Sequence, residues 1–243
     1  MPDNQAALIN AIAKENPNTI IVLNAGGNVA MQSWLPNVKA LVHAWYPGQE
    51  GGTAIAEILF GKINPSGKLP ASFEKRWEDN PVFNNYYDTN NNKHVAYKEG
   101  LFYGYRYYDT TAVKPQFAFG FGLSYTTFAY SNLSVKMIRG KSPKVLVSFT
   151  IKNTGGMDGS EVAQVYVHQG KCTAIRPVKE LKGFTKVFLK KGETKTLTVM
   201  LNEDAFSYYK TAAKQFGFDK GSFNIIVAAA SDDIRLQKEV KVE

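Results

Sequence analysis

Two glutamates of the sequence stand where a carboxylate could do chemistry, and the first is Glu50. It follows the apolar run Ala40–Tyr46, which predicts a buried strand, and Trp45, Tyr46 and Gln49 beside it could contact a ligand. Ligands of open parallel sheets bind outside the carboxyl ends of the strands, which is where Glu50 is expected. A negative charge also suits the N-terminus of the helix predicted next in the chain, and this structural role is the favoured interpretation.

The second glutamate, Glu99, lies in a stretch rich in aromatic residues and precedes Gly100. A carboxylate in apolar surroundings can have a raised pKa that suits general acid catalysis. Arg106 is near in the sequence, however, and offers Glu99 an ion pair, so a structural role is again favoured. The surrounding tyrosines could form a sugar-stacking platform or pack between domains, and His43 is interpreted as a core or sheet residue.

Residue types that bind metals are scarce. Cys172 is the single cysteine, and the three histidines are scattered at positions 43, 94 and 168. One cysteine excludes an internal disulfide and any site built from several cysteines. We therefore expect no metal site and no cofactor.

Composition and charge set broader limits. The chain has 243 residues, of which 44% are hydrophobic and 21% charged, as in globular proteins. Its net charge of +8 falls entirely after Tyr125, where 19 basic residues face 11 acidic ones. These lysines sit singly between apolar residues, which indicates solvated strand faces, and we expect no nucleic-acid partner; lysines clustered on one face would contradict this.

The first part of the chain shows alternating helix and strand patterns. Apolar residues at helical spacing predict helices over 5–14 and 53–60, and β-branched or apolar runs predict strands over 19–24 and 40–46. Strands that are apolar on both faces and alternate with helices indicate a covered parallel sheet. Two strands are too few for such a sheet, so this segment resembles the end of a larger α/β domain.

The rest of the chain divides into a connector and an all-β region. Residues 62–125 are irregular, but too rich in aromatic residues for a disordered linker, so we expect them to pack across their neighbours. After Thr127 the apolar period becomes two, with strands expected over 145–151, 162–167, 181–188, 194–201 and 222–228. Such a series predicts an antiparallel sandwich of the immunoglobulin or fibronectin type III kind.

Four ordered stretches carry a resemblance to a known family. They read WYPGQEGG at 45–52, INPSGKLP at 63–70, YKEGLFYGYRYY at 97–108 and FGFGLSY at 119–125. In order and spacing they resemble the successive signatures of family 3 glycoside hydrolases, the β-glucosidase and β-xylosidase family. Two later stretches, NTG at 153–155 and EVAQVYV at 161–167, resemble the fibronectin type III-like domain that closes many of these enzymes.

The resemblance implies a retaining glycosidase in which two carboxyl groups about 5 Å apart act in turn. It places the nucleophile in a (β/α)8 barrel and the acid/base in a loop, both upstream of Met1. No catalytic residue is therefore expected here, and we expect the isolated chain to be inactive. Trp45, Tyr46, Gln49, Glu50 and Glu99 remain candidates for substrate binding.

The resemblance also divides the chain and suggests partners. Residues 1–73 are expected to be the last portion of the α/β sandwich domain, 74–126 a packed connector, and 127–243 the fibronectin-like sandwich. β-Glucoside or β-xyloside oligosaccharides would bind through the complete enzyme, and an uncovered sheet edge would favour a barrel segment as partner or self-association. The alternative is a non-catalytic carbohydrate-binding or scaffold module.

Targeting signals are not evident. Apolar runs are far shorter than the roughly 20 residues that span a bilayer, so no membrane span is expected. The polar residues after Met1 do not form a signal peptide. Relatives in the resembled family are often exported, which is consistent with a periplasmic or extracellular parent enzyme, but the sequence does not assign a compartment.

Overall fold

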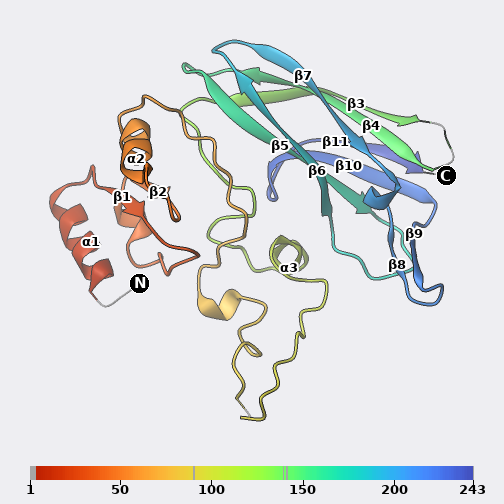
Figure 1. The fold of residues 1–243 in the computed structure, drawn as a ribbon, viewed down its shortest axis with the longest axis horizontal. Helices are drawn as coiled ribbons and strands as arrows, with labels where there is room; N and C mark the ends of the chain where they lie inside the picture. Colours follow the sequence, from red (N-terminus) through yellow and green to blue (C-terminus); the bar gives the residue numbers. More distant parts are fainter. Residues whose placement is uncertain (1–3, 90, 139, 141, 243) are drawn as a thin grey trace.

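A computed structural model describes residues 4–89, 91–138, 140 and 142–242. The chain forms an α/β part at its N-terminal end, a β-sandwich at its C-terminal end, and an irregular segment that runs between them (Figure 1). Within the described residues, no helix has both the length and the apolar character that crossing a membrane requires.

The α/β part contains two strands and two helices. Their bounds are Gln5–Glu15 for α1, Ile20–Leu23 for β1, Ala40–His43 for β2 and Gly51–Leu59 for α2. Strands β1 and β2 pair in parallel, with Ile20 opposite Ala40. The elements agree with the sequence patterns to within a few residues at their ends.

Burial in this part differs from the expectation that both strands are covered on two faces. No residue of β1 or β2 is fully buried, and the Ile20 side chain is 48% exposed. Helix α1 buries Ile9 and Ala13 but leaves Leu8 and Ile12 exposed. The reason is that a two-stranded sheet with two helices has too few neighbours to cover its apolar residues.

The connector is irregular but anchored. Besides the short 3-10 helix Trp77–Asp79, it contains one helix, α3 (Tyr105–Thr110), that the sequence patterns did not predict. Its six residues are too short to show a helical period, and their aromatic character resembles a strand. The segment before α3 forms the long loop at the bottom of Figure 1.

The sandwich contains two antiparallel sheets. One has the strand order β3-β4-β7 and the other β11-β10-β5-β6, and a small hairpin, β8-β9, extends from one end. The bounds are β3 Phe128–Ile138, β4 Lys144–Asn153, β5 Gly159–Gln169, β6 Glu180–Leu189, β7 Thr194–Leu201, β8 Tyr208–Lys210, β9 Gln215–Gly217, β10 Gly221–Ala230 and β11 Asp233–Val242.

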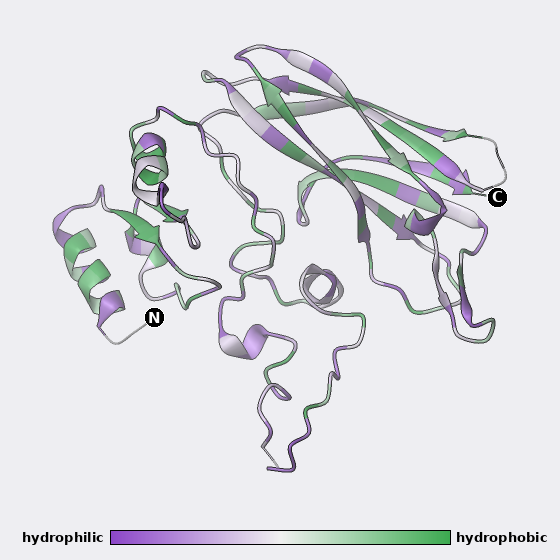
Figure 2. Ribbon diagram, in the orientation of Figure 1, coloured by the Kyte–Doolittle hydropathy of each residue, from purple (hydrophilic) through white to green (hydrophobic). Residues whose placement is uncertain are grey.

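The sandwich core follows the alternation of its strands. On β4, Val145, Val147, Phe149 and Ile151 are completely buried, as their two-residue period predicts. They pack against residues of β5 and β10 such as Ile225. Figure 2 shows apolar and polar positions alternating along these strands, as expected for sheets with one face toward a core.

Candidate functional site

The carboxyl end of β2 presents an aromatic pair. His43 ends the strand, and its ring stacks on Trp45 with centroids 4.2 Å apart and planes 24° from parallel. Trp45 has a φ of 55°, which is a rare conformation for a bulky residue. Its ring also packs edge-on against Phe73, at the end of the α/β part, with centroids 6.1 Å apart. Trp45 is therefore held in place by neighbours and is half-buried, with part of its surface toward solvent.

The residues after Trp45 turn across the end of the sheet. The Tyr46 side chain is 82% exposed and lies over Gly26, where an added Cβ would come within 2.5 Å of the tyrosine oxygen. Gln49 and Glu50 are exposed. The candidates Trp45, Tyr46, Gln49 and Glu50 therefore share one turn beside the carboxyl ends of the two parallel strands, as the sequence predicted.

Glu50 occupies the N-cap position of α2 without making a side-chain bond to the helix backbone. Its Oε2 instead accepts a hydrogen bond of 3.3 Å from the hydroxyl of Thr53. A negative charge at this end of a helix is stabilising. The geometry thus supports the structural interpretation of Glu50 and leaves its exposed carboxylate able to bind a ligand.

Glu99 lies apart from this turn. Its Oε2 is 3.5 Å from Nδ2 of Asn85, and the ion pair expected with Arg106 does not form. Arg106 bonds Glu180 of β6 at 3.2 Å instead, because helix α3 directs it toward the sandwich. Among the described residues, no hydrogen bond or ion pair joins Glu99 to Glu50, so the two carboxylates do not act as a directly coupled pair.

Glu180 is the centre of a charged network between the connector and the sandwich. Arg176 approaches its carboxylate at 2.6 Å, Arg106 at 3.2 Å and Lys182 at 3.6 Å. Burial alone would raise the pKa of Glu180, but hydrogen bonding to Arg176 and the three positive charges hold it below the ordinary value. Nearby, burial raises the pKa of Asp109, although Lys179 pairs with it at 2.6 Å.

Exposed aromatic residues gather on the connector loop, where the sequence suggested a sugar platform. The Tyr97 side chain is 87% exposed. The neighbouring rings of Trp77, Tyr86 and Tyr87 meet edge to face, with interplanar angles of 89° and 87°. Perpendicular rings do not make the flat surface that several stacked sugars need. This arrangement weighs against a binding module built on coplanar aromatics.

One polar residue beside the turn escaped the sequence analysis. Asn28 follows the Gly-Gly pair after β1, and its amide nitrogen donates a hydrogen bond of 3.0 Å to the Glu74 carbonyl. Its Oδ1 is buried and has no hydrogen-bond partner among the described residues. The rule that located Glu50, a polar residue after a parallel strand, applies equally to Asn28 and could have found it.

Two of the conspicuous motifs hold the parts of the chain together. The Asn64 side chain bonds Ser124 and the backbone of Tyr125 at 2.8 Å, and reaches the Asp158 carbonyl in the sandwich. Lys68 bonds the buried Glu161, which also accepts from the hydroxyl of Tyr130 at 2.9 Å; burial raises the pKa of that phenol. The motifs at 63–70 and 119–125 thus act as the junction between the α/β part and the sandwich.

Comparison with known proteins agrees with both halves of this architecture. The glycosyl hydrolase family 3 C-terminal domain matches residues 1–125, and a fibronectin type III-like domain matches residues 161–231. Thermostable β-glucosidase B of Acetivibrio thermocellus is 45% identical over the whole chain, which covers 32% of that protein. An exo-α-(1→6)-L-arabinopyranosidase of Bifidobacterium breve is 40% identical over the same extent, again with 32% of its length covered.

Solved structures give the same result. The β-glucosidase of Kluyveromyces marxianus in complex with glucose matches 100% of the chain with a TM-score of 0.94 and 42% identity, and 29% of that protein is covered. A family 3 β-glucosidase of Bifidobacterium adolescentis matches 99% of the chain, also with a TM-score of 0.94, at 39% identity and 35% coverage. The chain thus spans about a third of the length of the relatives it matches.

Proposed function

The chain belongs to glycosyl hydrolase family 3, and we propose that it serves as the C-terminal part of a β-glucosidase, where it forms one wall of the sugar site without supplying the catalytic carboxylates. The observation that carries this proposal is the turn after β2, in which Trp45 is fixed beside Tyr46, Gln49 and Glu50 at the end of a parallel sheet. Relatives named β-glucosidase match the chain throughout.

Hydrolysis with retention needs two carboxyl groups about 5 Å apart, one as nucleophile and one as acid and base. Glu50 is exposed and bonded to Thr53, whereas Glu99 belongs to the connector and bonds Asn85. Neither environment is an apolar pocket of the kind that suits a carboxyl group acting as a general acid. We therefore assign both residues at most a role in substrate binding, and we assign catalysis to the remainder of the glycosidase.

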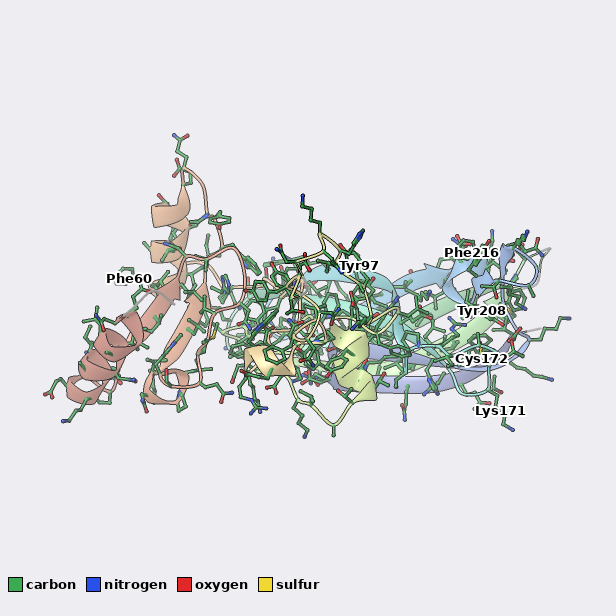
Figure 3. The ribbon with its side chains drawn as sticks, turned by 90° about the horizontal axis from the view of Figure 1, so that it is seen from below. Phe60, Tyr97, Lys171, Cys172, Tyr208 and Phe216 are labelled. Atoms are coloured by element: carbon green, nitrogen blue, oxygen red, sulfur yellow. The ribbon has the colours of Figure 1, made fainter. Side chains whose placement is uncertain are left out.

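The apolar surface of the α/β part supports a partner of that kind. Leu8 and Ile12 on α1, Ile20 on β1 and Phe60 after α2 are all exposed, with Phe60 90% exposed. Figure 3 shows Phe60 at the end of the molecule opposite the sandwich hairpin. Exposed apolar residues in one region mark an interaction surface. We propose that the remainder of the glycosidase covers it, and that self-association covers it when the chain is alone.

A chimera provides the test. The chain would replace the aligned 243 residues of the Acetivibrio relative, and hydrolysis of nitrophenyl β-glucoside and β-xyloside would be measured for the chimera and for the chain alone. We expect turnover by the chimera, with preference for the glucoside, and none by the chain. Turnover by the chain alone would place the catalytic carboxylates within it. A chimera that folds but is inactive would contradict the proposal that the chain forms one wall of the sugar site.

Substitutions in the chimera separate binding from catalysis. Trp45→Ala is expected to lower kcat/KM about tenfold, equivalent to about 1.4 kcal/mol of lost contact, whereas Trp77→Ala on the connector serves as the aromatic control. Glu50→Gln and Glu99→Gln are expected to change kcat less than about tenfold. A loss of several thousandfold in either variant would instead identify that glutamate as a catalytic residue.

A further inference from the structure

A polar groove of about 730 Å³ lies on the sandwich, away from the turn after β2. It is bounded by strands β5, β10 and β11 and by the loops at one end of them, and its lining includes His168, Lys171, Lys220, Asn224 and Glu239. Figure 3 shows Lys171 at the end of the sandwich farthest from the α/β part. The groove is large enough for a small ligand, since such sites commonly measure about 300–1,000 Å³.

The register of the sheet places three polar side chains in one row. Asn224 of β10 pairs directly with His168 of β5 on one side and with Glu239 of β11 on the other. Directly opposed residues project from the same face of a sheet. The flanking Ile225 is completely buried in the core, so this row lies on the outer face.

The row retains unused hydrogen-bonding capacity. His168 Nδ1 donates to the carbonyl of Val178, since a carbonyl can only accept, and this leaves Nε2 of a neutral ring as an acceptor. The Asn224 amide nitrogen donates to Gln237 at 3.4 Å, which leaves its oxygen open. Ser222 donates to Glu239 at 2.8 Å and so occupies one of several lone pairs of that carboxylate. These groups could accept hydrogen bonds from hydroxyl groups of a ligand.

Positive charge stands at the loop end of the groove. Lys171 follows β5 and Lys220 precedes β10, both are exposed, and neither ammonium group forms an ion pair within the described residues. Some other lysines of the sandwich do form ion pairs, such as Lys179 with Asp109 and Lys210 with Asp219. The groove therefore combines these two cations at its loop end, and Lys238 on β11, with several hydroxyl-binding acceptors.

We propose that this groove binds an acidic oligosaccharide, in which carboxylate groups contact Lys171 and Lys220 and hydroxyl groups contact the row of His168, Asn224 and Glu239. A sugar acid offers both kinds of group on each ring. A nucleic acid fits less well, because the lining that the described residues form has none of the phenylalanine, tyrosine or tryptophan side chains on which bases stack. The site would hold a polymer beside the enzyme without occupying the glucoside site.

Binding of galacturonate oligomers to the 243-residue chain tests the proposal, with neutral galactan oligomers and a single-stranded oligodeoxynucleotide of similar length as comparisons. The variant pair Lys171→Gln with Lys220→Gln is expected to weaken galacturonate binding at least tenfold. The matched control, Lys144→Gln with Lys152→Gln, removes two exposed lysines from the opposite sheet. It is expected to change the affinity for galacturonate less than twofold.

Asn224→Ala supplies a second measurement that leaves the charge unchanged. We expect it to weaken galacturonate binding severalfold, which a diffuse electrostatic attraction would not show. Circular dichroism would establish that each variant keeps its sheet content. The proposal is overturned if galacturonate does not bind, if both lysine pairs have equal effects, if neutral galactan binds as tightly, or if the oligodeoxynucleotide binds more tightly.

Discussion

The two ends of the molecule bury their apolar residues to very different degrees. The sandwich encloses a core in which Val147, Phe149 and Ile225 have no exposed surface, whereas β1 and β2 contain no fully buried residue. The difference follows from sheet type. Two antiparallel sheets need only to face each other, while a parallel sheet needs cover on both faces. A sandwich is therefore complete on its own, and a two-stranded parallel sheet is not.

Dividing the chain would test this contrast most severely. We propose boundaries near residues 73 and 126, and expect residues 127–243 alone to unfold cooperatively in urea and residues 1–73 alone not to. The physical reason is that the sandwich keeps its whole core, whereas the α/β segment loses Phe117 from its small core and the backbone hydrogen bonds that join Leu69 and Phe73 to residues 116–121. Cooperative unfolding of the short segment would show that its exposed apolar surface needs no partner.

Single substitutions in the intact chain sharpen the same comparison. Phe149→Ala should cost about 3–5 kcal/mol of unfolding free energy because it opens a cavity in a sealed core, and Leu8→Ala should cost less than about 1 kcal/mol because Leu8 is exposed. Far-UV circular dichroism would follow the sandwich strands. Tryptophan fluorescence would follow the other end, since Trp34, Trp45 and Trp77 all precede the sandwich. Equal costs would contradict the difference in burial.

The junction between the two ends should respond to pH through Glu180. Its pKa lies below the ordinary 4.5, so its charged form stabilises the folded state fully above that value, and this stability is lost as pH falls through the folded pKa. Glu180→Gln should cost about 3 kcal/mol at pH 7, since three cations lose their shared partner, and should flatten the pH dependence below the ordinary pKa of a glutamate. The comparison variant Glu193→Gln removes a more exposed pair with Lys195 and should cost less, and it should also change the pH dependence, because hydrogen bonds to the Lys190 backbone and to Lys195 hold the pKa of Glu193 below its ordinary value. Urea titrations at each pH provide the measurement.

Two glycines should give smaller effects than the loss of Phe149 or Glu180. An added Cβ at Gly122 would lie 2.1 Å from the backbone oxygen of Gly67, so Gly122→Ala should destabilise the junction by about 1–3 kcal/mol. Gly52 in α2 has open space around it, and Gly52→Ala should stabilise that helix by up to about 1 kcal/mol. Thermal unfolding of both variants would check the opposite signs. A stable Gly122→Ala protein would show that the two motifs can separate at little cost.

Local patterns predicted the strands of the sandwich better than the connector. Val145 to Ile151 alternate because each strand has one face in the core, and this period is visible in any long enough segment. Helix α3 has only six residues, and Tyr105 and Tyr107 within it could equally belong to a strand. The patterns do not predict β3 and β11 either. A register shift between Ser131 and Ser134 interrupts the period of β3, and the exposed edge strand β11 carries charged residues where apolar ones would reveal the period.

The sequence by itself determined the helices and strands of the α/β part, five strands of the sandwich, the family resemblance and the turn that carries Trp45 and Glu50, because these depend on residues close together in the chain. Only the tertiary structure decided which distant charges meet. Arg106 pairs with Glu180 and not with Glu99, Asn64 reaches the sandwich, and His168, Asn224 and Glu239 form one row. Such pairings depend on the register and docking of separate elements, which short-range patterns do not specify.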